Sequence, residues 1–265
     1  MRSGSPIPLA LGVLAVFGGM GACSASPVSW NDPIAIAAPL GAVRLELDGG
    51  GNARFVAAPQ VAHTSPPNVG SCAASLRTAL GTKHLFAVWW AVRADSSAGL
   101  LSASSVDSGA TWTPPLAVDT ADVSHAGCTR PPPSLTVVGD DVHVAYSMVA
   151  PEGTGVFFTH FMYGMFHSPV AVIYGERLVP TSIAAQGDTV AVAYEEPNGS
   201  RQRIDLALST TMGHIFAWRT EATRDVDDGR LPAVAIHGSL IAVAWEPAGA
   251  ADSANARVVR VGRVH

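Results

Sequence analysis

The sequence predicts an all-β protein: a β-propeller of about five four-stranded blades, with four blades as the alternative. The main observation is a repeat of roughly fifty residues, in which two apolar segments flank a glycine turn. It covers residues 75–90, 133–147, 180–195 and 232–246. Apolar and polar residues alternate with period two within each repeat, as in half-buried strands, and no segment shows convincing helical periodicity. Repeats of this length built from four strands are typical of propeller blades.

The residues of each repeat account for its predicted turns and strands. The turn glycines are Gly81, Gly139, Gly187 and Gly238, and Gly-Asp pairs follow the pattern that tight hairpins require. Two more strand-like segments follow each of the first three pairs: 99–106 and 114–120, then 155–162 and 168–174, then 203–210 and 218–223. Each of these three units therefore predicts a complete blade.

The fourth unit is incomplete, because only residues 256–264 follow its strand pair. We expect the N-terminal segments 33–39, 43–48 and 53–59 to supply the missing strands. Pairing of N-terminal with C-terminal strands would remove the free sheet edges. A two-sheet sandwich is the alternative, although sandwiches do not need a repeat of this length.

The N-terminal segment predicts export. Residues 9–17 form an apolar run that is too short to span a bilayer, and small residues precede Cys23 as in a bacterial lipobox, with Met20 where leucine is usual. We expect a lipoprotein-type signal peptide at 1–22, a lipidated Cys23, a linker at 23–32 and a single propeller domain at 33–265. The expected location is the bacterial cell envelope, as a membrane-anchored lipoprotein. An ordinary signal peptide and a secreted protein are the alternative.

Charge and composition limit the partners. The formal net charge is −5 and Lys83 is the single lysine, so no basic stripe exists for a nucleic-acid backbone. A glycan, an acidic small molecule or a protein remain as partners, and a membrane only through the lipid anchor. We expect no cofactor. We also expect no metal, because the nine histidines show no tight spacing of the kind that zinc sites use.

Two cysteines remain if Cys23 carries lipid. Cys72 and Cys128 occupy similar places, in the loops that lead into two successive innermost strands. Adjacent blades would bring these loops together, and export would place them in an oxidising compartment. We therefore predict a Cys72–Cys128 disulfide, with two buried free thiols as the alternative.

One octet of the sequence carries the residues that would stabilise a tight turn. Residues 105–112 follow the pattern Ser-x-Asp-x-Gly-x-Thr-Trp, between the third and fourth strands of the first unit. Asp107 can accept backbone N–H bonds within the turn, Gly109 allows a backbone that a Cβ would forbid, and Trp112 can bury its ring. The predicted role of the set is structural; its members are Ser105, Asp107, Gly109, Thr111 and Trp112.

This octet resembles the Asp box of the sialidase (BNR) superfamily of propellers. Altered copies occur at 209–213 with Trp218, at 47–50 with Phe55, and around Gly164. Strand directions alternate, so the Asp-box turns share one face with the glycine hairpins. A ligand site would lie on the opposite face, which carries the remaining loops.

Three arginines precede innermost strands and are expected at that opposite face: Arg130, Arg177 and Arg230. Guanidinium groups bind carboxylates through two parallel hydrogen bonds. Sialidases hold the carboxylate of sialic acid with an arginine triad, so the resemblance implies a ligand-carboxylate role for the three. Ordinary surface arginines are the alternative.

A sialidase also needs a tyrosine nucleophile, an activating glutamate and a separate acid. Tyr194 beside Glu195 is the single suggestive pair, and Asp95 is a candidate acid by loop position alone. Adjacent strand residues point to opposite faces, so Tyr194 and Glu195 should not touch. Tyr194 also occupies an aromatic position that indicates packing between blades and is shared with Trp90, Tyr146 and Trp245.

The catalytic set is therefore incomplete. The sequence favours an exported, lipid-anchored propeller that serves as a binding or scaffold module for a glycan, an acidic small molecule or a protein. The alternative is a sialidase-like glycoside hydrolase, an exo-α-sialidase, that uses the arginines to hold its substrate.

Overall fold

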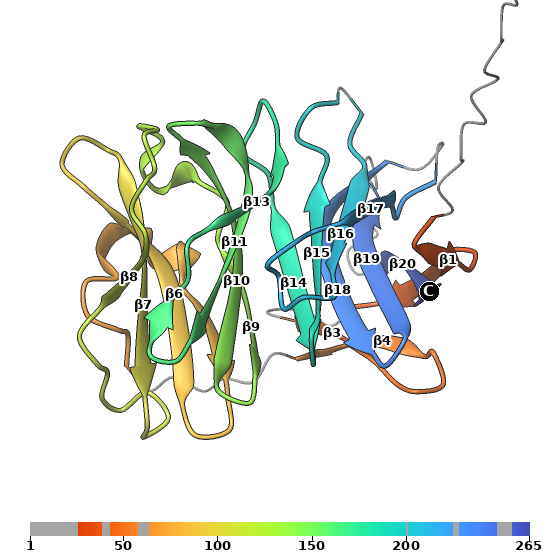
Figure 1. Cartoon of the computed structure of the whole chain (residues 1–265), viewed down its shortest axis with the longest axis horizontal. Helices are drawn as coiled ribbons and strands as arrows, with labels where there is room; N and C mark the ends of the chain where they lie inside the picture. The colour runs from red at the N-terminus through yellow and green to blue at the C-terminus, as the bar shows by residue number, and fades with distance from the viewer. Residues whose placement is uncertain (1–25, 39–42, 58–63, 200, 225–227, 248–255) are drawn as a thin grey trace, which may run out of the picture.

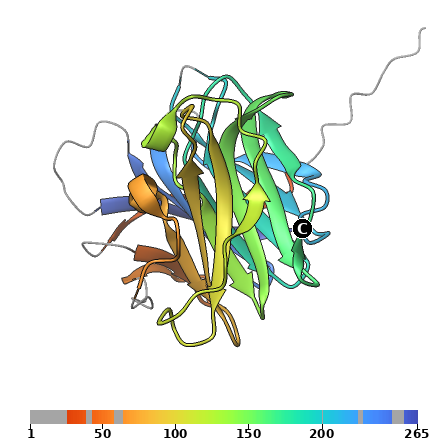
Figure 2. The same cartoon turned by 90° about the vertical axis from the view of Figure 1, so that its left-hand side faces the viewer.

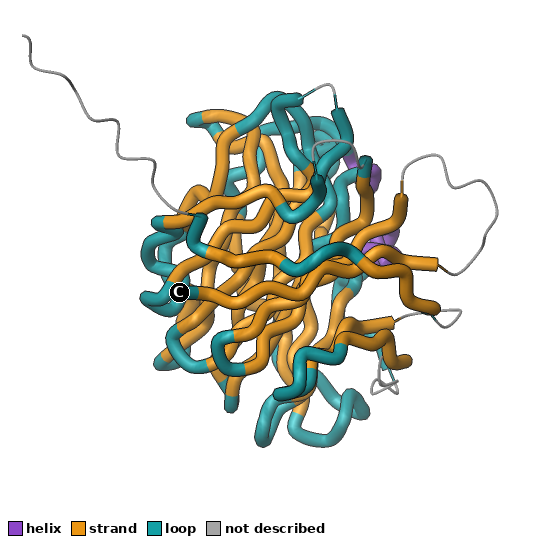
Figure 3. Tube along the Cα trace, turned by 90° about the vertical axis from the view of Figure 1, so that its right-hand side faces the viewer, coloured by secondary structure: helices purple, strands orange, loops and turns teal. Residues whose placement is uncertain are grey.

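A computed structural model describes residues 26–38, 43–57, 64–199, 201–224, 228–247 and 256–265 (Figure 1). The predicted signal peptide at 1–22 and the predicted lipidation site Cys23 lie outside the described residues. Strands make up most of the described chain, and the two helices in it are short 3-10 turns, η1 (Gly70–Ser75) and η2 (Gly127–Thr129) (Figure 3). Within the described residues, no helix has the length and apolar character to cross a membrane.

Three sheets follow the chain order that the repeat predicts. The first blade contains β5 (Arg77–Leu80), β6 (Leu85–Val92), β7 (Ala98–Ser105) and β8 (Leu116–Asp119). The second contains β9 (Ser134–Val138), β10 (Asp141–Ala150) and β11 (Gly153–Met162), with β12 (Met165–Phe166) and β13 (Val170–Tyr174) along the edge of β11. The third contains β14 (Thr181–Gln186), β15 (Thr189–Glu195), β16 (Ile204–Ser209) and β17 (Trp218–Glu221).

The fourth blade joins the two ends of the described chain. It contains β18 (Gly229–His237), β19 (Leu240–Pro247) and β20 (Ala256–Val264), and the free edge of β20 pairs with β1 (Val28–Trp30) and β2 (Ile34–Ala37). N-terminal and C-terminal strands of the described chain therefore share one sheet. The predicted linker at 23–32 is wrong for Val28–Trp30, because these residues pair with β20 in register from Val28 opposite Val264.

A fifth sheet has two strands in the described chain, β3 (Val43–Leu47) and β4 (Ala53–Ala57). The first strands of the sheets, β5, β9, β14 and β18, contact one another in succession, and β3 contacts β18. The sheets therefore follow one another across the molecule in chain order, as blades do (Figures 1 and 2). The all-β propeller class predicted from the sequence is confirmed, with four sheets of four or five strands and a two-stranded fifth among the described residues.

The hairpins and loops separate onto two faces. The hairpins within β5–β6, β9–β10, β14–β15 and β18–β19 lie at one end of the sheets, together with the turns that follow β7 and β16; we call this end the turn face (Figure 1). The loops that enter β9, β14 and β18, and those after β6, β10 and β15, lie at the other end, the loop face. Gly139 and Gly187 adopt positive φ of 66° and 55° in their hairpins, as predicted from the Gly-Asp pattern, and Gly238, which a serine follows, has a φ of 58°.

The aromatic position of the repeat packs between blades. Trp90, Tyr146, Tyr194 and Trp245 are each at most 1% exposed. The rings of Trp90 and Tyr146 meet edge to face with centroids 6.0 Å apart, within the apolar cluster between the first and second blades. This confirms the packing role predicted for Tyr194 and explains why the position is aromatic in every complete repeat.

Candidate functional site

The Asp box at residues 105–112 is a turn lock, as predicted. Asp107 accepts hydrogen bonds from the Ser105 hydroxyl at 2.7 Å and from the Thr111 N–H at 2.8 Å. These bonds lower the pKa of Asp107 to about 2, with the Ser105 bond the largest cause. Gly109 has a φ of 89°, which a side chain would strain. The carboxylate is fully engaged in holding its own turn.

The tryptophan of this box ties the turn to a neighbouring segment. The Trp112 indole N–H donates to the carbonyl of Thr64 at 3.1 Å. Its ring packs against the outer side of the first blade, on the cluster that contains Trp89 and Ala87. The first blade is thereby closed on that side by residues that precede its own first strand.

The third blade keeps the same turn with different side chains. Ser209 accepts from the N–H of Gly213 at 3.0 Å, as Ser105 accepts from that of Gly109 at 2.8 Å. Thr211 takes the place of the aspartate and accepts from the Ile215 N–H at 3.1 Å. The aromatic residue of this copy is the buried Phe216, so the assignment of Trp218 from the sequence is wrong. Trp218 begins β17 and is exposed, because the copy has no extra residues.

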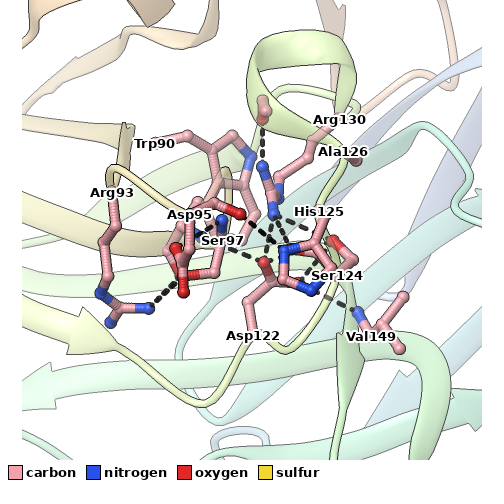
Figure 4. A network of polar contacts seen from close by, with 12 residues as sticks. Trp90, Arg93, Asp95, Ser97, Asp122, Ser124, His125, Ala126, Arg130 and Val149 are labelled. Atoms are coloured by element: carbon pink, nitrogen blue, oxygen red, sulfur yellow. Dashed lines mark hydrogen bonds and ion pairs between the residues drawn. The ribbon is translucent and has the colours of Figure 1, made fainter.

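Arg130 does not reach a ligand at the loop face. Its side chain is 0% exposed and forms an ion pair with Asp122, whose side chain is 1% exposed (Figure 4). The guanidinium also donates to the carbonyl of Gly127 and to the Ser124 hydroxyl, and it lies over the ring of Trp90 at 5.7 Å. The expected carboxylate-binding role of Arg130 is therefore replaced by an internal carboxylate.

The predicted disulfide is present beside this network. Cys72 in η1 and Cys128 in η2 are bonded, with Cα atoms 5.2 Å apart and a sequence separation of 56. In the chain-entropy model a loop of this size contributes about 4 kcal/mol to the free energy of unfolding. The bond joins the loops that enter β5 and β9, so it fixes the segment that carries Arg130.

The proposed catalytic residues lack the required environments. Asp95 accepts from the N–H and hydroxyl of Ser97, and these bonds lower its pKa, whereas a glycosidase acid needs a raised pKa (Figure 4). Burial raises the pKa of Tyr194, with a further contribution from Asp205, so its hydroxyl stays protonated. Glu195 instead accepts from the Leu231 N–H at 2.9 Å and supports a neighbouring loop.

Arg177 and Arg230 flank one short segment at the end of β15. Arg177 is exposed and donates to the carbonyl of Glu196 at 2.6 Å. Arg230 is 50% exposed and lies 3.4 Å from Glu246, while the next residue, Leu231, donates to Glu195. Arg177 precedes β14 and Arg230 lies on β18, and these two innermost strands are in contact.

Behind them lies a cluster of carboxylates around Arg203. Arg203 donates to Glu196 at 2.7 Å, and its Nε lies 3.4 Å from Asp205 Oδ1 and its Nη1 3.9 Å from Glu221. Burial raises the pKa of Asp205 to about 7, and the hydrogen bond to Glu196 adds to this effect. The pKa of Glu196 is lowered by its bonds to Asp205, the Asn198 N–H and Arg203, against the effect of burial. The two carboxyls share a proton near neutral pH.

Two members of these networks were not found from the sequence. Asp205 lies within β16, where an alternating pattern indicates only a half-buried strand, and Asp122 lies in a loop without a motif. The signal for Asp205 was indirect: Arg201, Arg203 and Glu196 surround the same loop in the sequence.

The sequence matches no protein-family model and no curated protein. Among solved structures, it is similar to a Trypanosoma rangeli sialidase, with 13% identity over 85% of this chain and 40% of that chain, at a TM-score of 0.49. It is also similar to a GH43 endo-arabinanase from Bacillus licheniformis, with 10% identity over 88% of this chain and 92% of that chain, at a TM-score of 0.44. A neuraminidase-like protein of a bat influenza virus gives 13% identity over 65% of this chain and 45% of that chain, at 0.44. The chain spans less than half of the sialidase and of the neuraminidase-like protein. These similarities do not indicate its activity.

Proposed function

We propose that this protein is an exported, lipid-anchored Asp-box propeller that binds a carboxylate-bearing sugar or similar small acid without hydrolysing it. The binding site is the loop face between the third and fourth blades. The observation that carries the proposal is that Arg177, in the loop before β14, and Arg230, on the neighbouring innermost strand β18, are both exposed and flank the segment Glu195–Glu196.

The chemistry of these two arginines suits a carboxylate. Within the described residues, Arg177 has one hydrogen bond, to a backbone carbonyl, and its side chain is exposed, so part of its planar donor fork is open to solvent. The ion pair that the described residues form with Arg230 is solvent-exposed, and pairs of this kind contribute little stability. A ligand carboxylate can therefore replace that contact and form charge-assisted bonds to both arginines.

The state of the carboxylates supports binding over hydrolysis. Glycosidases place their two carboxyl groups roughly 5 Å or more apart, so that sugar or water fits between them. Glu196 and Asp205 are hydrogen-bonded to each other, which leaves no space for a scissile bond. Arg203 contacts both carboxyl groups and holds them together.

Export is supported by two independent features. The lipobox-like segment that ends in Cys23 directs the chain to the envelope, and the Cys72–Cys128 disulfide fits an oxidising compartment. Lipid attachment at Cys23 would be tested by mass spectrometry of the envelope fraction, where a Cys23→Ser variant should lose the modification.

The test of binding uses calorimetry on the purified chain with sialic acid, glucuronic acid and glucose. We expect the two acids to bind and glucose not to bind. Arg177→Ala and Arg230→Ala should each weaken the binding of both acids by about tenfold or more, since each substitution removes charge-assisted hydrogen bonds. Arg54→Ala is the matched control, because Arg54 is also exposed and paired with one glutamate, Glu46.

Equal binding of glucose and glucuronic acid would contradict the proposal, as would acid binding that survives both arginine substitutions. Release of a fluorescent group from a sialoside by the wild-type chain would establish the hydrolase alternative.

A further inference from the structure

Three histidines from two blades meet at the turn face. His160 lies near the end of β11, His167 lies between β12 and β13, and His214 lies in the turn between β16 and β17. One ring nitrogen from each falls within 4.8 Å of the others. The sequence expectation of no histidine cluster is wrong, because residues that are distant in the chain become neighbours where the second blade packs on the third.

The histidines occupy Asp-box positions of the altered copies. His160 stands four residues before Gly164, as Ser105 stands four residues before Gly109, and both glycines have positive φ, 86° and 89°. His214 directly follows Gly213, in the turn of the third blade. The turn backbone is retained in these blades. In the second blade His160 stands where the first blade has the locking serine, whereas the third blade keeps Ser209 and carries His214 directly after its turn glycine.

The innermost imidazole, that of His160, has one buried ring nitrogen without a hydrogen-bond partner in the described part of the chain. His160 is 2% exposed, and its Nε2 is buried without a hydrogen bond among the described residues. A buried polar nitrogen in this state costs stability and indicates a missing ligand. Its ring centroid lies 4.3 Å from that of His167 and 4.8 Å from that of His214.

The surroundings keep His160 uncharged and fixed. Burial lowers the pKa of His160 to about 4, and the nearby His167 and His214 add to this effect. Its ring lies 5.8 Å from that of Phe158, and Asp141 and His143 on β10 are the other ionisable groups that affect it. Imidazole nitrogens are metal ligands, and the three ring nitrogens that lie within 4.8 Å of one another supply the geometry for a shared ion.

We propose that His160, His167 and His214 form a binding site for a divalent transition metal, with zinc as the expected ion. Imidazole ligands favour zinc, copper and nickel, whereas calcium and magnesium prefer oxygen ligands. Three histidines and one open position for water are an established ligand number for tetrahedral zinc. The ion would join the second blade to the third, on the face opposite the proposed ligand site.

Closure of the site needs only side-chain movement. Tetrahedral zinc with Zn–N bonds of about 2.0 Å holds its nitrogens about 3.3 Å apart, so the observed separation must shorten. His214 is exposed and His167 is half-buried, so both rings can rotate toward the fixed His160. The exposed position of His214 also leaves solvent access for the fourth ligand.

The test uses chain purified without a polyhistidine tag. Calorimetry with Zn²⁺ should give one ion per chain, with no heat from Ca²⁺, and bound Co²⁺ should give the visible absorption bands of nitrogen ligation. His167→Ala and His214→Ala should weaken Zn²⁺ binding by at least about tenfold. His237→Ala is the control, because His237 is an exposed histidine in the β18–β19 hairpin on the same face.

Zinc should also raise the melting temperature of the wild-type chain and not that of His214→Ala, since an ion that binds the folded state alone stabilises it. Absence of Zn²⁺ binding would overturn the proposal. Binding that is equally strong in His214→Ala and His167→Ala would also overturn it. Because His214 is exposed, its substitution tests the site without a packing defect.

Discussion

The first and third blades share one architecture and differ at both ends. At the turn face, the first blade has a complete Asp box whose carboxylate is occupied by its own turn. The third blade has a threonine in that place and a histidine beside the turn glycine. At the loop face, the first blade is covered by the buried Arg130–Asp122 pair and the disulfide, whereas the third carries Glu196 and Asp205 with one shared proton.

The comparison shows that internally paired groups stabilise the fold, whereas incompletely paired groups remain available to bind a ligand. In the first blade every charged group of these networks is paired internally, so the networks hold the loops and leave nothing for a ligand. In the third blade the turn keeps its backbone through Ser209, while ionisable groups at both ends remain incompletely satisfied. The two proposed sites, one for an acid and one for a metal, both lie at the boundaries of the third blade for this reason.

The largest expected effect concerns the buried ion pair. Arg130→Ala leaves the buried Asp122 carboxylate without its counter-charge, although the Ser124 hydroxyl and backbone N–H groups still donate to it, so we expect the free energy of unfolding to fall by about 3–5 kcal/mol. Urea denaturation measures this change. Arg230→Ala removes an exposed pair and should change stability by less than about 1 kcal/mol. Similar losses in the two variants would contradict the proposed difference, because they would show that the buried and the exposed ion pair contribute equally to stability.

The turn of the third blade provides the next effect. Gly213 has a φ of 87°, and a Cβ there would overlap the ring of Phe158. We expect Gly213→Ala to cost about 3 kcal/mol, from backbone strain together with overpacking. Gly164 has nearly the same φ, 86°, with open space around it, so Gly164→Ala should cost only about 1 kcal/mol. Equal melting temperatures of the two variants would show that the packing against Phe158 is not tight.

The smallest expected effect is the pH dependence of stability that arises from the proton shared by Glu196 and Asp205. The pKa of Asp205 is raised from 3.8 to about 7, so between these values the folded chain holds a proton that the unfolded chain has lost. Stability from this group therefore falls as the pH rises through that window. Asp205→Asn removes the effect, and the variant should gain about 2–3 kcal/mol on the wild type between pH 5 and pH 8.

The matched control for this pH dependence is Asp107→Asn in the first blade. The pKa of Asp107 is lowered to about 2, so both states of that group are ionised throughout the range and the difference from wild type should stay constant. Denaturation curves at pH 5 and pH 8 measure both variants. A pH-independent difference for Asp205→Asn would mean that Glu196 and Asp205 do not share a proton.

Features with local causes were predicted correctly from the sequence. The hairpin glycines, the Asp box and the aromatic position at Trp90, Tyr146 and Tyr194 depend on backbone geometry and on the period of one repeat. The Cys72–Cys128 bond followed from equivalent positions in neighbouring blades. The shift from Trp218 to Phe216 was missed because the motif was matched by residue type, while the turn is specified by the spacing from Gly213.

Features that depend on contacts between blades could not be predicted. The partner of Arg130 is Asp122, eight residues earlier in an irregular loop, and nothing in the pattern shows that the loop turns inward. In the sequence Asp205 is an ordinary strand residue, and only its burial and its contact with Glu196 in the folded chain raise its pKa. The three histidines come together only through the packing of the second blade against the third.

The pairing of β1 and β2 with β20 has a consequence for how the protein matures. β20 is synthesised after all the other described strands, so the fourth blade cannot gain its outer edge before residues 256–264 have emerged. The earlier blades are built from neighbouring strands and can form while synthesis continues, but Val28 must wait for Val264. Loss of the last ten residues should therefore leave an open edge that recruits other chains, and aggregation of such a truncated product would report the missing strand.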